Sequence, residues 1–269
     1  SVTITDASQC VDAAVVTIGH PAQLNSTLVA SSVRCFSEAN GSINISTTIG
    51  GIAPYNYQWQ NGSVTATSTG LNAGVYSVTI TDANDCIATF SSVVTQPTQL
   101  TVVAGNTVIC SGSPAPLSAM ASGSVPGYIY NWSSGQAGQN ISVSPLVSAI
   151  YTVTVTDANA CNAITTASVS VNDLPVVDFT SDVVDGCGPL CVTFTNTTAN
   201  TSSMQWNFGH AATSVVAPAT HCYNISGTYH VSLTVTDNNG CVNSLTKNNY
   251  ITVYPDPIAA FSSNPNPAT

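Results

Sequence analysis

Apolar and polar residues alternate strictly in a short segment that recurs along the chain. In residues 76–81, YSVTIT, the apolar side chains fall on every second position. This is the period of a strand that buries one face. Asp82 and the three residues after it then favour a turn, because Asp and Asn bond their own backbone. The apolar run over 87–95 predicts the returning strand of a hairpin.

The same strand and turn occur four times, and each copy has an Asp followed four residues later by a Cys. The copies lie about 75 to 80 residues apart, which predicts one small domain repeated in tandem. The four pairs are Asp6 and Cys10, Asp82 and Cys86, Asp157 and Cys161, and Asp237 and Cys241.

A Trp lies upstream of each complete copy, and a Tyr stands where its strand begins. A large aromatic side chain in the middle of a domain is a natural core anchor. A Tyr at the start of a late strand is typical of the tyrosine corner of immunoglobulin-like sandwiches. The sequence contains no amphipathic helical pattern of ten residues, so we expect an all-β chain, a tandem array of immunoglobulin-like antiparallel β-sandwiches. The predicted core anchors are Trp59, Trp132, Trp206, Tyr76, Tyr151 and Tyr229.

Composition narrows the range of partners. The 269 residues carry a net charge of -10 with only two Lys or Arg residues. Binding to nucleic acid requires many cationic side chains, and so does docking on an anionic membrane surface. We therefore expect neither of these partners. No run of 18 apolar residues is present, so we expect no membrane insertion.

Nine cysteines in a Lys-poor β sequence favour an oxidising, extracellular setting. We expect each disulfide to join the early part of a domain to its own hairpin turn. Cys10 would then stay unpaired, because its partner would precede residue 1 of a chain cut from something longer. The predicted pairs are Cys35–Cys86, Cys110–Cys161, Cys187–Cys241 and Cys191–Cys222.

The sequence contains no arrangement that predicts catalysis. The Gly-x-Ser-x-Gly elbow, the His-Glu-x-x-His helix and phosphate-binding glycine loops are all absent. His20 lies in a linker. His210, His221 and His230 share one domain, where a cluster is the alternative, but we expect them to be scattered over its surface and strands. We therefore expect no enzyme, no catalytic residue and no cofactor-binding residue.

Calcium is the one ligand that the carboxylates suggest. Calcium takes six to eight hard oxygens, and two short segments offer several. The alternative interpretation is that these carboxylates cap turns or are solvated. The candidates are Asp82 and Asp85 in one turn, and Asp182 and Asp185 in another segment.

Two regions resemble known repeats. Residues 33–97 resemble the SprB-type repeat of Bacteroidota gliding adhesins, through segments such as 57–59, YQW, and 71–74, LNAG. Residues 175–254 resemble a PKD domain, through 206–209, WNFG, although His210 and Ala211 stand where Asp-Gly is usual. Residues 101–174 are similar to looser immunoglobulin-like relatives. The expected domains are the end of a truncated SprB-like repeat (1–24), a SprB-like repeat (25–100), an immunoglobulin-like or PKD-like domain (101–174), a PKD domain (175–254), and a linker with the start of a next domain (255–269).

The resemblance implies a segment of a long, secreted cell-surface filament protein that acts as a stiff, disulfide-stapled stalk in adhesion or gliding, with export by the type IX pathway. Its partners would be neighbouring repeats of the same chain, with identical chains in a fibre and surface glycans as further partners. Glycans would bind at exposed aromatics, whose alternative role is packing. Two other functions stay open: spacer or carbohydrate-binding modules of a large secreted hydrolase, and a subunit of a self-assembling fibre or sheath. The aromatics in question are Tyr55, Tyr57, Tyr128 and Tyr130.

Overall fold

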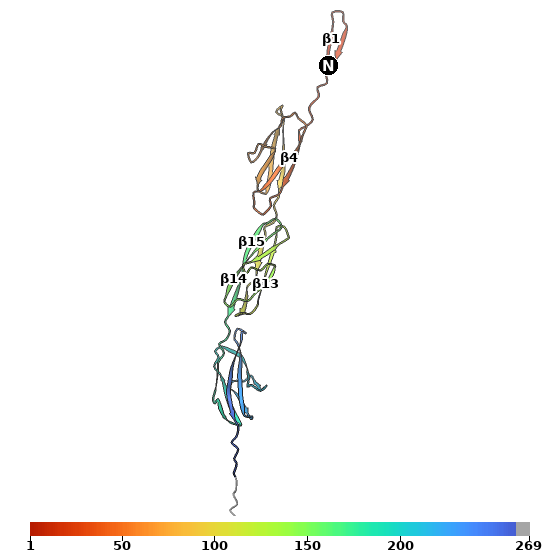
Figure 1. Ribbon diagram of the computed structural model, residues 1–269. Helices are drawn as coiled ribbons and strands as arrows, with labels where there is room; N and C mark the ends of the chain where they lie inside the picture. Colours follow the sequence, from red (N-terminus) through yellow and green to blue (C-terminus); the bar gives the residue numbers. More distant parts are fainter. Residues whose placement is uncertain (262–269) are drawn as a thin grey trace, which may run out of the picture.

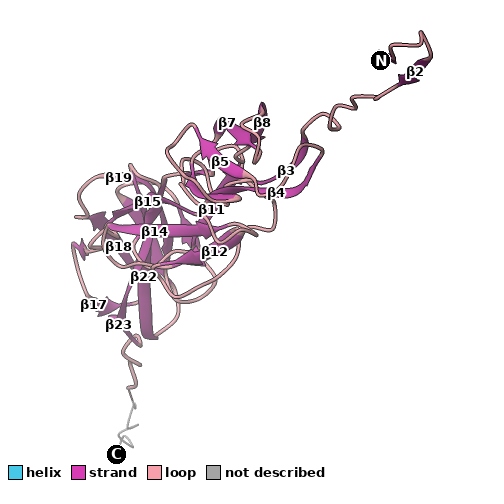
Figure 2. Cartoon of the chain, turned by 90° about the horizontal axis from the view of Figure 1, so that it is seen from above, coloured by secondary structure: helices cyan, strands magenta, loops and turns pink. Residues whose placement is uncertain are grey.

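A computed structural model describes residues 1–261, and within that range the chain contains strands and loops but no helix. Three β-sandwiches follow one another end to end, with a hairpin beyond one end and a tail beyond the other (Figure 1). Figure 2 shows the same arrangement from above, with strands throughout the sandwiches. The predicted all-β class is confirmed. Residues 262–269, part of the expected start of a next domain, lie outside the described residues.

Sandwich 1 consists of two three-stranded sheets, with the orders β3-β4-β6 and β5-β7-β8. The alternation predicted for residues 76–81 is realised in β7, where Val78 and Ile80 are fully buried. β7 pairs antiparallel with β8, so the predicted hairpin is present. The strands are β3 (Asn25–Ser31), β4 (Gly41–Ile49), β5 (Asn56–Trp59), β6 (Thr67–Leu71), β7 (Gly74–Thr81) and β8 (Ile87–Val94).

Sandwich 2 has a three-stranded sheet, β13-β11-β9, and a four-stranded sheet, β10-β15-β14-β12. Strand β10 runs parallel to β15 and places Cys110 opposite Asn172. The alternating pattern did not predict this parallel pair, because alternation carries no information about strand direction. The strands are β9 (Thr101–Ala104), β10 (Thr107–Cys110), β11 (Ala115–Ser122), β12 (Ile129–Trp132), β13 (Asn140–Val143), β14 (Ala149–Thr156) and β15 (Asn162–Asn172).

Sandwich 3 has a three-stranded sheet, β16-β18-β21, and a five-stranded sheet, β17-β23-β22-β19-β20. Strand β17 runs parallel to β23, with Cys187 opposite Tyr254. Cys191 and Cys222 are partners in the β18–β21 ladder and form the predicted disulfide. The strands are β16 (Phe179–Ser181), β17 (Asp185–Cys187), β18 (Leu190–Asn196), β19 (Thr201–Asn207), β20 (Thr213–Ser214), β21 (Ala219–Tyr223), β22 (Gly227–Asp237) and β23 (Val242–Tyr254).

Each sandwich has its own hydrophobic core, and the predicted aromatic anchors belong to these cores. The Tyr that begins each late strand packs half-buried against its core. Tyr76 donates its hydroxyl hydrogen to the carbonyl of Asn72 (3.2 Å), and Tyr229 donates to the carbonyl of Ile225 (2.7 Å). These two contacts are tyrosine corners. The three Trp side chains, Trp59, Trp132 and Trp206, are all buried.

The N-terminal hairpin stands apart from sandwich 1. It pairs β1 (Val2–Thr5) with β2 (Val11–Ala14), and all of its residues are exposed. Val2, Ile4 and Val11 therefore have no sheet covering them. Among residues 1–261, no helix has the length and apolar character needed to cross a bilayer.

Candidate functional site: the joints between the sandwiches

Each sandwich has two poles. The N-pole is the end that receives the preceding linker. The C-pole is the opposite end, at which the last strand leaves the sandwich. We call the segment from each repeated Asp to the Cys four residues later the Asp turn. It precedes the last strand and lies at the N-pole. In sandwich 1, this turn meets the loop at Gly51 and the linker at Ala22. In sandwich 2 the last strand, β15, then carries the chain over 11 residues to the C-pole. At about 3.3 Å per residue, the two poles are about 36 Å apart.

The early cysteine of every sandwich lies at the C-pole. Cys110 is opposite Asn172, the last residue of β15, and Cys187 is opposite Tyr254, the last residue of β23. In sandwich 1, Val33 donates its N–H to the carbonyl of Thr95, just beyond β8. Cys35 therefore occupies the same pole.

This placement overturns the three predicted disulfides within domains. Cys110 and Cys161 lie at opposite ends of β15, about 36 Å apart, whereas a disulfide needs its two Cα atoms within about 7 Å. The prediction failed because it ordered the cysteines along the sequence without the direction of the early strand. Strand β8 has 8 residues, about 26 Å, and β23 has 13 residues, about 43 Å, so the same argument excludes Cys35–Cys86 and Cys187–Cys241.

The disulfides instead cross the joints. Cys35, at the C-pole of sandwich 1, bonds Cys161 at the N-pole of sandwich 2, with Cα atoms 5.7 Å apart. Cys110, at the C-pole of sandwich 2, bonds Cys241 at the N-pole of sandwich 3, with Cα atoms 5.5 Å apart. Within residues 1–261 three cysteines form no disulfide, namely Cys10, Cys86 and Cys187.

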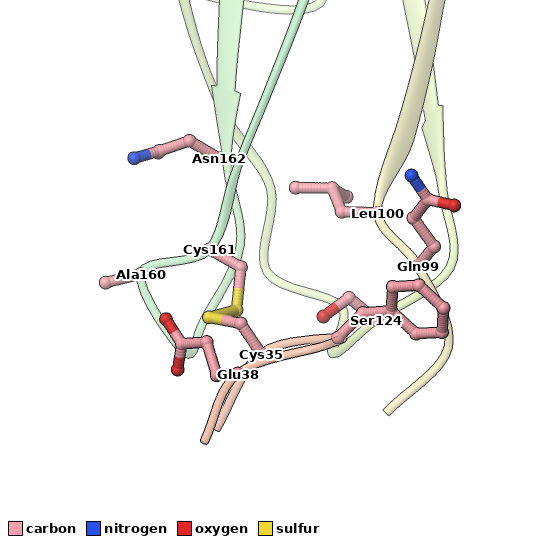
Figure 3. A pocket seen from close by; sticks show the side chains of 9 residues that line it. Cys35, Glu38, Gln99, Leu100, Ser124, Ala160, Cys161 and Asn162 are labelled. Carbon is pink, nitrogen blue, oxygen red and sulfur yellow. A yellow bond between two sulfur atoms is a disulfide. The ribbon is translucent and has the colours of Figure 1, made fainter. Parts of the chain in front are cut away.

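A shallow cleft lies beside the first interdomain disulfide, which lines one side of it (Figure 3). Asn159 of the Asp turn donates a side-chain N–H to the carbonyl of Arg34 (2.9 Å), so a hydrogen bond accompanies the covalent link. Among the lining residues, Glu38 is the only ionisable one outside the disulfide, which gives the cleft no catalytic set. The lining residues are Cys35, Phe36, Glu38, Gln99, Leu100, Ser124, Ala160, Cys161 and Asn162.

The second joint repeats this arrangement. Cys241 is fully buried. Asn243, two residues further on, donates a side-chain N–H to the carbonyl of Pro175 (2.9 Å). A second cleft is lined by linker residues 173–176 together with Asp237 and Asn239 of the turn. The proline-marked linker therefore packs on the turn that carries the bonded cysteine.

A buried carboxylate holds each of these turns in shape. In sandwich 2, one oxygen of Asp157 accepts the backbone N–H groups of Asn159 (2.9 Å) and Cys161 (2.8 Å). Its other oxygen accepts the hydroxyl of Ser124 and the N–H of Val125. Asp157 therefore ties the turn to the neighbouring loop and fixes the backbone of the bonded cysteine.

The turn of sandwich 1 is built the same way. Asp82 accepts the N–H groups of Asn84, Cys86 and Ile52. The Ile52 bond is the main reason why the pKa of Asp82 lies below its usual range, while burial opposes this shift. For Asp157, burial is the largest single influence and raises the pKa, but the hydrogen bonds from Ser124, Cys161, Val125 and Asn159 together outweigh it and lower that pKa.

The calcium candidates are not gathered into a site. Asp82 is engaged by backbone N–H groups, and Asp182 accepts the N–H groups of Val183 and Thr193. Asp185 accepts the hydroxyl of Tyr254. In the described part of the chain, no group of three or more His, Cys, Asp or Glu side chains could hold a metal ion.

The predicted scattering of the histidines is wrong for two of them. The Nε2 atoms of His210 and His221 lie 3.0 Å apart, and the His221 ring stacks on Phe208 at 4.6 Å. His230 instead accepts the N–H of Asn249 through Nδ1. Burial lowers the pKa of His221, and the adjacent His210 lowers it further.

The four tyrosines proposed for glycan binding pack against the rims of the cores. The hydroxyl of Tyr55 donates to the carbonyl of Gly50, and that of Tyr128 donates to the carbonyl of Gly123. The hydroxyl of Tyr130 accepts the N–H of Ala121. All four tyrosines, including Tyr57, are half-buried, which favours the packing role.

A glycine at the N-pole fits against the linker, and sequence reasoning missed it. Gly123 has a φ of +83°, and a Cβ there would lie 2.1 Å from the carbonyl oxygen of Gln99. In sandwich 1, a Cβ at Gly50 would likewise lie 2.1 Å from the carbonyl oxygen of Gln23. The sequence held one signal of this contact, namely two equivalent linkers. They are Ala-Gln-Leu, ending at Leu24, and Thr-Gln-Leu, ending at Leu100.

We expect Gly123→Ala to destabilise sandwich 2 by about 3 kcal/mol or more, because a left-handed conformation costs about 1–2 kcal/mol and the clash adds to it. Gly135→Ala is the matched control, since Gly135 has a φ of +84° with nothing near its Cβ position. Denaturant unfolding of the two variants measures the difference. Equal losses would mean that the linker makes no close contact at Gly123.

Sandwich 3 is expected to lose stability as the pH falls from 7 to 5. The pKa of His221 is lowered in the folded state, so the unfolded chain takes up a proton near pH 6.5 that the folded chain does not. The stabilisation is present above that pH and is lost below it. Urea titrations at several pH values should show a flatter profile for His221→Gln; an unchanged slope would exclude His221 as the cause.

Comparison with known proteins supports the two assignments made from the sequence. Residues 27–64 match the family model of the SprB repeat, and residues 172–253 match that of the PKD domain. The resemblance of these regions, in that order, is confirmed. Domains of these types are typical of extracellular and cell-surface proteins and are typically non-catalytic.

Individual relatives match parts of the chain. A stretch of 43 residues is 54% identical to Collagenase ColA of Clostridium perfringens (strain 13 / Type A) and covers 16% of this chain and 4% of the collagenase. The PKD1 domain of Vibrio cholerae metalloprotease PrtV is 34% identical, with a TM-score of 0.26, over 30% of this chain and 96% of that domain. Three immunoglobulin domains of titin are 12% identical, with a TM-score of 0.39, over 87% of this chain and 99% of that one.

Proposed function

We propose that this chain is a segment of a stiff extracellular stalk that extends adhesive surface away from a cell. The observation that carries the proposal is that two successive joints are each closed by a disulfide between neighbouring sandwiches. A joint closed only by a linker leaves its domains free to reorient. Here the linker and the disulfide form two covalent connections, which restrict both bending and twisting.

Two further features support this proposal. The polypeptide linkers contain Pro97 and Pro175 and lack flexible Gly/Ser runs. The first linker also binds the loop that Asp157 ties to its turn, through a backbone hydrogen bond from Ser124 to the carbonyl of Thr98 (3.1 Å). Adhesion, gliding and export by the type IX pathway remain part of the proposal and rest on the SprB resemblance alone.

A spacer within a secreted hydrolase is a second candidate, because part of the chain is similar to a collagenase and to the PKD domain of a metalloprotease. In that case too the chain itself would hold no catalytic residues. A catalytic domain in the same reading frame would favour this candidate over an adhesin.

Small-angle X-ray scattering and negative-stain microscopy of Cys35→Ser with Cys161→Ser test the stalk. We expect the variant to keep three folded sandwiches but to show a broad range of angles at the first joint, whereas the unmodified chain stays straight. Cys191→Ser with Cys222→Ser is the matched control, because that disulfide lies within sandwich 3. An equally straight double variant at the first joint would contradict the proposed role of the interdomain disulfide.

A further inference from the structure

The unbonded thiol of Cys187 occupies the same place as a bonded one. In sandwich 2, Cys110 pairs with the last residue of β15, and the next residue, Ser111, donates its N–H to the carbonyl of Asn172 (2.9 Å). In sandwich 3, Cys187 pairs with the last residue of β23, and Gly188 donates to the carbonyl of Tyr254 (3.3 Å). Cys187 is exposed at this C-pole.

The segment that leaves sandwich 3 repeats the one that leaves sandwich 2. Pro175 follows Asn172 by three residues, and Pro257 follows Tyr254 by the same number. Phe179 then follows Pro175, as Phe261 follows Pro257. Phe179 is fully buried in the core of sandwich 3. The sequence after Tyr254 thus repeats the spacing of Pro and Phe with which a sandwich begins after Asn172.

Cys86 shows the complementary situation at the N-pole of sandwich 1. Its turn has the same Asp-capped geometry as the turns that carry Cys161 and Cys241. It lies beside linker residues 21–24, as Cys161 lies beside Gln99 and Leu100. Cys86 is nevertheless exposed and unbonded.

We propose that Cys187 and Cys86 are bonding positions for further β-sandwiches of the same kind. Cys187 takes the Asp-turn cysteine of a sandwich joined after Tyr254, and Cys86 takes the C-pole cysteine of a sandwich on its N-terminal side. The chain is then one stretch of a series in which every joint is closed by a disulfide. This inference rests on the pairing geometry of the two existing joints and holds whether or not the series serves as a stalk.

The bond forms by oxidation of two thiols. The Cys187 thiol and the partner thiol lose two electrons and two protons as their S–S bond forms. A disulfide oxidant, either a small-molecule disulfide or the disulfide of an oxidoreductase, accepts them and is reduced to two thiols.

In the test, a second copy of residues 173–254 is inserted into the full chain between Tyr254 and Pro255. The copy carries Cys187→Ser, so that only the original Cys187 is available, and Ser244→Thr as a mass label. After oxidation with a glutathione redox buffer, cleavage before Asp should yield peptide 185–236 linked to the labelled peptide 237–255. The Cys191–Cys222 bond of the copy reports that the added sandwich has folded.

Two results would overturn the proposal while that folding signal is present. The original Cys187 could remain open to alkylation, or the labelled Cys241 could bond a cysteine other than the original Cys187. In the extended chain, a further Cys187→Ser at the original position should leave the labelled Cys241 thiol reactive, whereas Cys86→Ser should leave the new bond intact.

Discussion

Pulling on the ends of the chain should extend the stretch between Cys35 and Cys241 about four-fold less with both interdomain disulfides than without them. The shortest covalent path runs from Cys35 to Cys161, back along the chain to Cys110, and across to Cys241. That path holds about 50 residues, or roughly 180 Å when fully extended. Without the disulfides the stretch holds about 200 residues, or roughly 700 Å.

Single-molecule force spectroscopy measures these lengths directly. The comparison is between the unmodified chain and a variant with Cys35→Ser and Cys110→Ser. A variant with Cys191→Ser and Cys222→Ser should behave like the unmodified chain, because its missing bond lies off the shortest path. Equal extension of the unmodified chain and the Cys35/Cys110 variant would show that the force does not pass through the joints' disulfides.

Asp157→Ala should destabilise sandwich 2 by about 3 kcal/mol or more, because it leaves buried backbone donors without an acceptor. Asp157 is only 3% exposed, and its carboxylate accepts the N–H groups of Asn159 and Cys161. Loss of these bonds also frees the backbone that holds the bonded cysteine. The Cys35–Cys161 bond should therefore be reduced faster by dithiothreitol.

Asp6→Ala is the control for this change. Asp6 accepts the same two N–H groups of its own turn, from Ser8 and Cys10, but it is exposed and has no partner in another loop. It should leave the unfolding of all three sandwiches unchanged. If Asp157→Ala unfolded at the same denaturant concentration as the unmodified chain, the carboxylate would be a solvated turn residue and nothing more.

Local patterns in the sequence were enough to predict the parts of the fold that depend on neighbouring residues. The alternation in residues 76–81 predicted β7, because a half-buried strand imposes a two-residue period. Asp82 predicted the turn that follows, since its side chain bonds the backbone N–H groups of Asn84 and Cys86. Trp59 predicted a core, because a side chain of that size is buried wherever the fold allows.

The disulfide pattern could not be predicted in this way, because it depends on the direction of a distant strand. Nothing near Cys110 in the sequence states that β10 runs parallel to β15, and that pairing alone places Cys110 at the far pole from Cys161. The contact of Gly123 with Gln99 was missed for a related reason. The disulfides join segments that meet only after two domains have packed end to end, and Gly123 meets Gln99 only once β11 has paired with β9 in sandwich 2.

The pairing of the cysteines across the joints is the central claim, and non-reducing peptide mapping after cleavage before Asp tests it most directly. The structure predicts that peptide 12–81 is linked to 157–172, and that 85–156 is linked to 237–255. Disulfides within each domain would instead link 12–81, 85–156 and 157–172 into one product and join 185–236 to 237–255. Finding that product would contradict the account.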